Sequence, residues 1–337
     1  MDKEKYIRAI ESFPKRKILV LGDYCIDRIW NISKILLNPE APVMRTITYP
    51  SGIIDTLGAA GNVSKGLRAL QTQIYVLGVV GIDEGSNSLL ELFLKEGIKT
   101  EGMISQNGRV TPIYQRLVSG KELPYPTQTM QRLDLENNIL IEENILSKIL
   151  KYIERKIHEI DAIILADYQE GEAKGVANKF LIKDLVQKAR KAKKILIGDS
   201  RERFHLFGGY TAITPNRKET NRTLETLNEN ISQNPCDNAK KLVEHLGVKY
   251  TLIKRDREGL VISSSEEFRN FSATTPENKV IGVCGAGDVV TEIFTLGLVS
   301  GLSCFESAEL ANIGAGISVQ KPGISVVSLE ELLKAIS

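Results

Sequence analysis

Residues 282–289 read Gly-Val-Cys-Gly-Ala-Gly-Asp-Val and lead into an apolar run that extends to Leu298. The small residues Gly285, Ala286 and Gly287 let the backbone come close to a ligand and turn its amides toward one point. The apolar run predicts a buried helix, whose N-terminus adds partial positive charge at the same point. This stretch therefore predicts an anion-binding turn at the start of a helix.

Asp288 places a carboxylate directly beside this turn. A carboxylate next to an anion-binding turn suits a base that deprotonates an alcohol as the alcohol attacks a phosphoryl group. The alternative is that Asp288 caps the helix and the glycines only form a turn. The local sequence leaves both interpretations open.

Working outward, apolar runs of strand length alternate with stretches of helical periodicity. The expected strands are residues 17–21, 74–80, 162–166, 194–197, 211–213 and 250–253, and the expected helices are residues 63–70, 86–95, 145–158, 173–191 and 236–246. This alternation predicts an α/β fold, in which helices cover both faces of a mostly parallel sheet.

Residues 29–55 and 109–134 break this alternation, because they consist of short extended pieces with prolines. Together they predict a small β lid over the carboxyl ends of the sheet strands, where open α/β sheets bind ligands. The alternative is a pair of surface hairpins. No linker separates two independent units, so residues 1–337 are expected to form a single domain.

Composition favours a small-molecule partner. The 337 residues carry 44 Lys plus Arg and 42 Asp plus Glu, a net charge of +2, which argues against nucleic acid and anionic lipid as partners. No apolar run reaches the roughly 18 residues of a membrane span. The four cysteines lack C-x-x-C spacing, and the N-terminus lacks a secretion signal. A cytoplasmic location is therefore expected.

Two further segments offer groups for a sugar. Asp27 is one of two acids that follow the first expected strand, and carboxylates commonly hold sugar hydroxyls. The run from Gly58 to Val63 is rich in small residues and opens a helix, so a ligand could approach its backbone while Asn62 offers a donor and an acceptor. Tight helix packing explains the same small residues equally well.

Asn216 and Glu219 follow another expected strand and stand one helical turn apart. They fit an outer shell that holds magnesium through water, and they fit an N-terminal capping box equally well. No G-x-G-x-x-G or G-x-x-x-x-G-K-[ST] motif occurs, which argues against a dehydrogenase and a P-loop enzyme. The three histidines show no metal-ligand spacing.

In this order and spacing the motifs resemble the ribokinase-like, phosphofructokinase-B type carbohydrate kinases from about Lys17 to the end of the chain. Within them, Asn-Pro-Glu-Ala-Pro-Val at residues 38–43 is similar to the Ser-Pro-Glu-Ala-Pro-Val of the D-glycero-β-D-manno-heptose-7-phosphate kinases. The resemblance implies a three-layer sandwich with a β lid, ATP and magnesium as cofactors, and a homodimer formed through the lid. It also implies transfer of the γ-phosphoryl group to the anomeric hydroxyl of the heptose phosphate.

The resemblance further implies a role for each matching residue. The implied site has Asp288 as the base, the amides of Gly285, Ala286 and Gly287 as the anion hole, Asn216 and Glu219 as the residues that order magnesium and phosphate, Asp27, Gly58 and Asn62 around the sugar, Arg116 and Arg201 at the substrate's phosphate, and Gly259 and Asn312 near adenine.

This chain departs from the resemblance at several positions. Gly282 and Cys284 stand where the family usually has Asp and Thr, which leaves dependence on potassium undecided. Ala59 replaces a glycine near the sugar, and Tyr114 and Glu170 replace lysines near the substrate's phosphate. These changes leave two alternatives, a kinase for another sugar and a catalytically impaired binding protein. The nucleotidyltransferase that some heptose kinases carry is expected on a separate protein.

Overall fold

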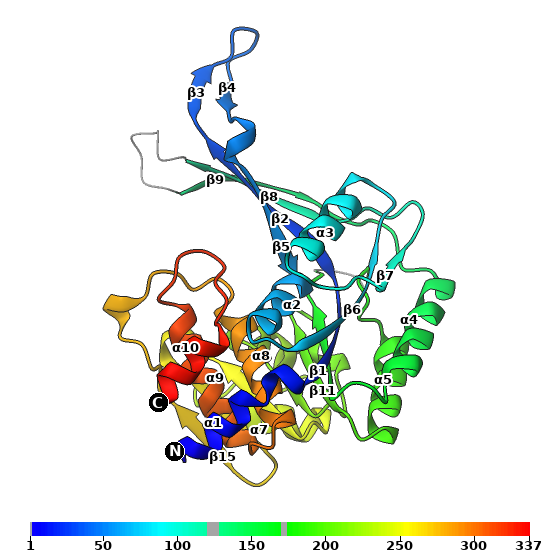
Figure 1. Cartoon of the computed structure of the whole chain (residues 1–337), viewed down its shortest axis with the longest axis vertical. Coiled ribbons are helices and arrows are strands. Elements are labelled where there is room, and N and C mark those ends of the chain that lie inside the picture. Colours follow the sequence, from blue (N-terminus) through cyan, green and yellow to red (C-terminus); the bar gives the residue numbers. More distant parts are fainter. Residues whose placement is uncertain (1, 120–127, 170–173) are drawn as a thin grey trace.

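The computed structural model describes residues 2–119, 128–169 and 174–337. Its main sheet, over these residues, has nine strands in the order β15-β14-β13-β12-β11-β10-β1-β6-β7 (Figure 1). The strands are β1 Lys17–Gly22, β6 Gln73–Val80, β7 Gly102–Ser105, β10 Ala162–Asp167, β11 Ile195–Ser200, β12 Ala212–Ile213, β13 Tyr250–Lys254, β14 Leu260–Ser263 and β15 Phe268–Phe271. From β7 to β13 neighbouring strands are parallel, and β14 and β15 add two antiparallel strands.

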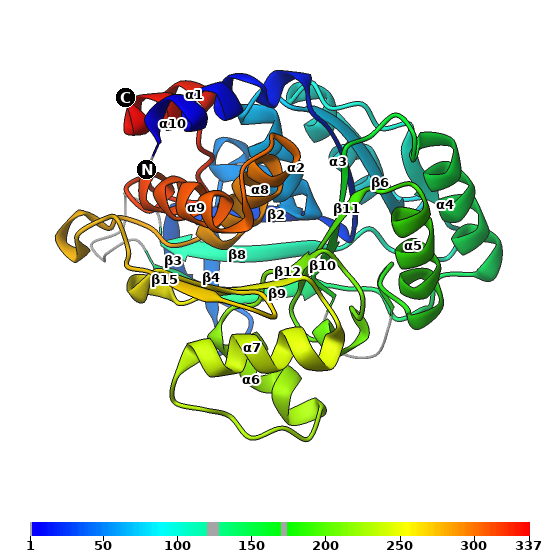
Figure 2. The ribbon, with the colours of Figure 1, turned by 90° about the horizontal axis from the view of Figure 1, so that it is seen from below.

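Helices cover both faces of this sheet (Figure 2). One face carries α1 Lys3–Glu11, α2 Ala60–Ala69, α3 Glu84–Lys95, α8 Ala286–Val299, α9 Cys304–Ser318 and α10 Leu329–Ile336, and the other carries α4 Glu143–Lys156, α5 Lys179–Lys191, α6 Arg217–Thr226 and α7 Pro235–Leu246. Alternation along β1 sends Ile18 and Val20 into the first core and Leu19 and Leu21 into the second. The predicted three-layer α/β architecture is confirmed.

A second, four-stranded sheet in the order β5-β2-β8-β9 stands beside the first. It consists of β2 Tyr24–Ile32, β5 Ile53–Ala59, β8 Ile113–Ser119 and β9 Thr129–Leu135, and a hairpin of β3 Lys34–Leu37 and β4 Met44–Ile47 extends it. The hairpin and the β9 end project away from the main sheet (Figure 1). The predicted extended segments are thus strands, although β2 begins earlier, at Tyr24.

The ends of the expected helices and strands lie within three residues of those in the structure, with one exception. The helix expected over residues 173–191 begins only at Lys179, because the side chain of Asn178 accepts a hydrogen bond from the backbone N–H of Leu181 and caps it there. The strand expected at 211–213 is reduced to Ala212 and Ile213. Short 3₁₀ helices complete the connections at Phe13–Lys15, Pro50–Gly52, Phe204–Leu206, Asp256–Glu258 and Glu277–Lys279.

Helices α2 and α8 pack against each other, and both begin near the carboxyl ends of the parallel strands. Glu292 of α8 is buried in this contact and faces Gly66 of α2, where any side chain would overlap its carboxyl group. Burial raises the pKa of Glu292 well above its ordinary value, and the nearby charge of Asp288 adds to this effect. The Glu292 carboxyl group therefore fills the space that Gly66 leaves between the two helices.

The chain changes direction across the sheet between β1 and β10, the position at which open α/β sheets form a crevice. Asp167 ends β10 and is fully buried, where it accepts hydrogen bonds from Arg203 and Ser200. This buried ion pair fixes the loop after β11 against the end of β10. None of the helices in the described ranges is long and apolar enough to cross a membrane.

Candidate functional site

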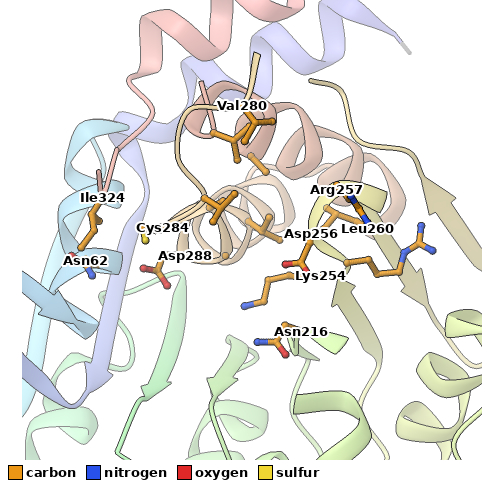
Figure 3. A pocket seen from close by; sticks show the side chains of 18 of the residues that line it. Asn62, Asn216, Lys254, Asp256, Arg257, Leu260, Val280, Cys284, Asp288 and Ile324 are labelled. Atoms are coloured by element: carbon orange, nitrogen blue, oxygen red, sulfur yellow. The ribbon is translucent and has the colours of Figure 1, made fainter. Parts of the chain in front are cut away.

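A cavity of about 810 Å³ lies at the carboxyl ends of the parallel strands, between the second sheet and helices α8 and α9 (Figure 3). Its volume is within the range of small-molecule sites. The lining residues include Asp27, Asn62, Arg116, Arg201, Asn216, Glu219, Gly259, Gly285, Ala286, Gly287, Asp288 and Asn312. The structure therefore brings together every candidate site residue of the sequence analysis except Gly58.

The turn at Gly285 to Asp288 starts α8 as predicted. Gly285 is the N-cap, with φ +84°, and no side chain caps this end of the helix. Asp288 accepts a hydrogen bond from the Tyr168 hydroxyl at 2.7 Å, so the interpretation of Asp288 as a helix cap is wrong. One detail of the expected anion hole also changes, because the amide of Ala286 donates to the carbonyl of Val283 at 3.3 Å.

Asp288 is poised to exchange a proton near neutral pH. Burial, reinforced by the charge of Asp199, raises its pKa to about 6. The hydrogen bond from Tyr168 and the charges of Lys254 and Arg201 act in the opposite direction. The carboxylate form thus predominates at pH 7 but remains basic enough to accept a proton from a hydroxyl group.

The sequence analysis missed a polar network behind Asp288. Asp199 accepts hydrogen bonds from Thr291 at 3.0 Å and Tyr168 at 3.3 Å, and the ammonium of Lys254 lies 3.2 Å from both of its carboxylate oxygens. Asp199 is near the end of β11 and Lys254 ends β13. Their positions as polar residues directly after expected apolar strands were the signal that could have found them.

At the opposite end, Asp27 on β2 and Asn62 on α2 enter the cavity from the second sheet and its following helix. Burial raises the pKa of Asp27, although Arg116 and neighbouring arginines oppose the shift. Gly58 pairs with Cys25 in the sheet, and a Cβ at this glycine would crowd the Cys25 sulfur and the Asp27 carboxylate. Gly58 therefore makes room for Asp27 rather than lining the cavity.

The Asn216 and Glu219 pair forms the capping box of α6. The Asn216 side chain accepts from the Glu219 amide at 2.9 Å, and the Glu219 carboxylate accepts from the Asn216 amide at 2.7 Å. Both residues also line the cavity. Burial raises the pKa of Glu219 to about 7 against the opposing charge of Lys254. The structural alternative is thus confirmed without removing either residue from the site.

The described parts of the chain contain no group of three or more His, Cys, Asp or Glu side chains arranged to hold a metal ion directly. An amide and a carboxylate on the cavity wall at Asn216 and Glu219 supply oxygen atoms, which magnesium prefers. Magnesium commonly keeps several waters and binds substrate phosphates. The donors present therefore fit magnesium held through water, and they do not form a protein cage.

Gly259 and Asn312 form another part of the cavity wall. Gly259 has φ +87°, and a Cβ there would overlap the carbonyl of Phe271, so its backbone requires glycine. The Asn312 side chain donates to the carbonyl of Ser272 at 2.7 Å. Both residues hold the segment after β15 against α9, and this segment contributes Thr274 and Thr275 to the cavity.

The structure describes some of the positions at which this chain departs from the family pattern. Tyr114 and Cys284 line the cavity, and the guanidinium of Arg132 lies 5.2 Å from the centre of the Tyr114 ring. Arg132 also lines the cavity, so a cation that the sequence analysis missed stands beside the tyrosine. Glu170 lies outside the described residues.

Solved structures share this architecture. Arabidopsis thaliana ribokinase complexed with ribose and ATP matches with a TM-score of 0.71 and 18% identity, over 95% of this chain and 98% of that one. Phosphofructokinase-2 from Escherichia coli in complex with potassium gives the same four values. The fold is therefore that of the ribokinase-like kinases.

The sequence matches the pfkB family carbohydrate kinases over residues 15–331, and the chain belongs to this family. The family is one of carbohydrate kinases, which transfer a phosphoryl group to a hydroxyl group of a carbohydrate. Two similar relatives are the bifunctional protein HldE of Campylobacter jejuni, 33% identical over 95% of this chain, and that of Desulfatibacillum aliphaticivorans, 32% identical over 96%. The matches cover 65% and 63% of those proteins, so this chain spans less than two thirds of their length.

Ala59 adopts a backbone conformation that glycine prefers, with φ +53° and ψ −125°, at the cavity wall before α2. We expect Ala59→Gly to raise the free energy of unfolding by about 0.5–1 kcal/mol, because relief of strain exceeds the added entropy of the unfolded chain. Urea denaturation measures this change. Ala60→Gly, at the first residue of the helix, is the matched control and should lower stability, because it removes a buried methyl group. A loss of stability in Ala59→Gly would contradict the strain argument.

Proposed function

We propose that this protein is an ATP- and magnesium-dependent kinase that converts D-glycero-β-D-manno-heptose 7-phosphate to the 1,7-bisphosphate. The observation that carries the proposal is the place of Asp288, beside the turn at 285–287 and between the Asp27 and Asn216 ends of one cavity. Residues 38–43 and the likeness to the HldE proteins support the heptose phosphate as substrate. As part of the proposal, the chain forms one kinase domain and acts in the cytoplasm.

In this reaction Asp288 accepts the proton of the anomeric hydroxyl as its oxygen attacks the γ-phosphorus of ATP. The new bond joins the sugar oxygen to phosphorus, and the bond from phosphorus to the β,γ-bridging oxygen breaks. Its electron pair stays on the ADP that leaves. The amides of Gly285 and Gly287 stabilise charge on the phosphoryl group, and the partial positive charge at the start of α8 assists them.

Residues at one end of the cavity bind the substrate, and residues at the other end bind the cofactor. Asp27 and Asn62 bind sugar hydroxyls, and the guanidinium groups of Arg116 and Arg201 suit the 7-phosphate, since arginine binds phosphate in a bidentate manner. The nucleotide occupies the end near Gly259 and Asn312. When magnesium is bound, it neutralises phosphate charge, and Asn216 and Glu219 hold it through water.

The first test is turnover on a panel containing the heptose 7-phosphate, the same heptose without phosphate, fructose phosphates and ribose, with ATP and magnesium. We expect ADP release with the heptose 7-phosphate and little with the unphosphorylated heptose, because the arginines lose their partner. Asp288→Asn should reduce kcat by about 10²- to 10⁴-fold while nucleotide still binds. Parallel assays with and without potassium decide the cation requirement.

Other outcomes of these assays would change the proposed substrate, the proposed activity or the proposed base. Turnover on a different sugar reassigns the substrate and keeps the kinase. Absence of turnover across the panel, with nucleotide binding intact, favours the impaired binding protein. A kcat of Asp288→Asn equal to that of the unchanged protein removes Asp288 as the base.

The pH profile tests the environment of Asp288. Because its pKa is raised to about 6, kcat/KM should rise with pH and reach half of its plateau near pH 6. The Tyr168 hydrogen bond stabilises the carboxylate, so Tyr168→Phe should move this midpoint to higher pH. Tyr114→Phe changes a tyrosine of the same cavity and should leave the midpoint in place. An unchanged midpoint in Tyr168→Phe would contradict the assignment.

We also propose that two copies associate through their second sheets. Strand β9 is an open edge with every residue exposed, and Leu37 and Leu133 are 77% and 58% exposed. Exposed edges and apolar side chains favour pairing with another strand. Sedimentation should give twice the mass of one chain, and Leu133→Glu should shift it toward a single copy. A single-chain mass of the unchanged protein would refute the dimer.

A further inference from the structure

Lys254 is a buried cation on the floor of the cavity that the proposed reaction does not yet use. It ends β13, its backbone N–H donates to the carbonyl of Pro215 at 2.8 Å, and its side chain extends toward Asp288 (Figure 3). The side chain is only 13% exposed and lines the cavity. The end of a central strand therefore fixes its position from behind.

The ammonium group is held loosely by Asp199. Its nitrogen lies 3.2 Å from each Asp199 oxygen, a long and shared contact rather than one short hydrogen bond. Asp199 also accepts from Thr291 at 3.0 Å and Tyr168 at 3.3 Å. Because the Thr291 hydroxyl remains, Asp199 keeps a hydrogen-bond donor if the ammonium turns toward a ligand. An ammonium has three N–H groups, so it can also contact Asp199 and a second acceptor together.

The ammonium also lies against the anion-binding turn. A Cβ built on Gly287 would be 3.5 Å from the Lys254 nitrogen, so the missing side chain leaves space between the ammonium and this turn. Three carboxylates, those of Asp199, Glu219 and Asp288, surround the same space and interact electrostatically with Lys254. A polyphosphate can enter such a place only if positive charge offsets these carboxylates.

We infer that Lys254 is a phosphate-contacting residue, whose ammonium carries positive charge to the phosphoryl group as it passes the turn at Gly287. The inference rests on the proposed kinase reaction and adds a side-chain cation to it. Before nucleotide binds, Asp199 holds the ammonium in place. When the phosphates arrive, the ammonium shares its donors with them while Thr291 continues to hydrogen-bond Asp199.

The test compares Lys254→Met with Lys249→Met, an exposed lysine just before the same strand. On the best sugar of the panel, Lys254→Met should lower kcat by about 10²- to 10³-fold, as removal of one charge-stabilising donor does. Lys249→Met should leave kcat unchanged. In Lys254→Ala, added ethylammonium should restore part of kcat, since it supplies the missing group to the vacated space. Thermal melting of each variant confirms that the fold is retained.

A purely structural role gives a different pattern. If Lys254 only neutralises Asp199, then Lys254→Met combined with Asp199→Asn removes both charges and should recover both kcat and melting temperature. Recovery of kcat in this double variant overturns the inference, as does a kcat of Lys254→Met within threefold of the Lys249→Met control. A double variant that stays as slow as Lys254→Met, together with rescue by ethylammonium, supports phosphate contact.

Nucleotide binding separates this inference from the proposed function. Calorimetric titration with ADP and with a non-hydrolysable ATP analogue needs no sugar and no turnover. Lys254→Met should lose at least tenfold more affinity for the analogue than for ADP, because the lost contact is to the transferred phosphate. An equal loss for both nucleotides overturns the inference. If the unchanged protein phosphorylates no sugar, the proposed function fails, and this ratio of affinities still decides the role of Lys254.

Discussion

The hydrogen-bonded row from Lys254 through Asp199 and Tyr168 to Asp288 is the interaction on which the site depends. Its members come from the ends of β13, β11 and β10 and from the first turn of α8. The row therefore ties the start of one helix to three parallel strands of the main sheet. Without it, Tyr168, Asp288 and the Lys254 ammonium would lose the hydrogen bonds that they make inside the site, and Asp199 would keep its bond from Thr291. Burying polar groups without partners costs far more than the net gain from any one hydrogen bond.

The same row explains how carboxylates with raised pKa values share one cavity. Burial pushes the pKa values of Asp288 and Glu219 upward, to about 6 and about 7. Lys254 opposes both shifts from a single position, and the neighbouring carboxylates in turn raise the pKa of Lys254 despite its burial. Acidic groups with raised pKa values can thus lie close together around one cation, as general base chemistry near neutral pH requires.

The sequence predicted six of the seven parallel strands in the described part of the chain, all except β7, because their apolar runs are short, continuous and bounded by polar residues, as strands buried on both faces must be. It missed α9, since Cys304–Ser318 is buried almost all round and has no polar face to reveal its period. Among site residues, motif patterns found the turn at 285–288. They could not find the pairing of Tyr168 with Asp288, because 120 residues separate the two along the chain.

Local patterns also left choices that only the fold could decide. Asn216 and Glu219 serve both a capping box and the cavity, because the N-terminus of α6 points at the site. Gly58 was expected at the sugar. Its lack of a side chain instead makes room for Asp27, which lines the cavity. In both cases the same residue type suits a structural role in the backbone and a role in binding, and sequence spacing alone cannot separate these two roles.

The contact of Gly66 with Glu292 has a consequence for altering the acceptor specificity of this protein. Helix α2 begins at the Asn62 end of the cavity and α8 at the turn beside Asp288, so the contact between these helices links two parts of the cavity wall. Redesign of residues 58–62 for a larger acceptor would shift α2 and press on a carboxyl group with no space to retreat. Such a redesign therefore has to treat positions 66 and 292 as part of the binding pocket, although neither residue lines the cavity.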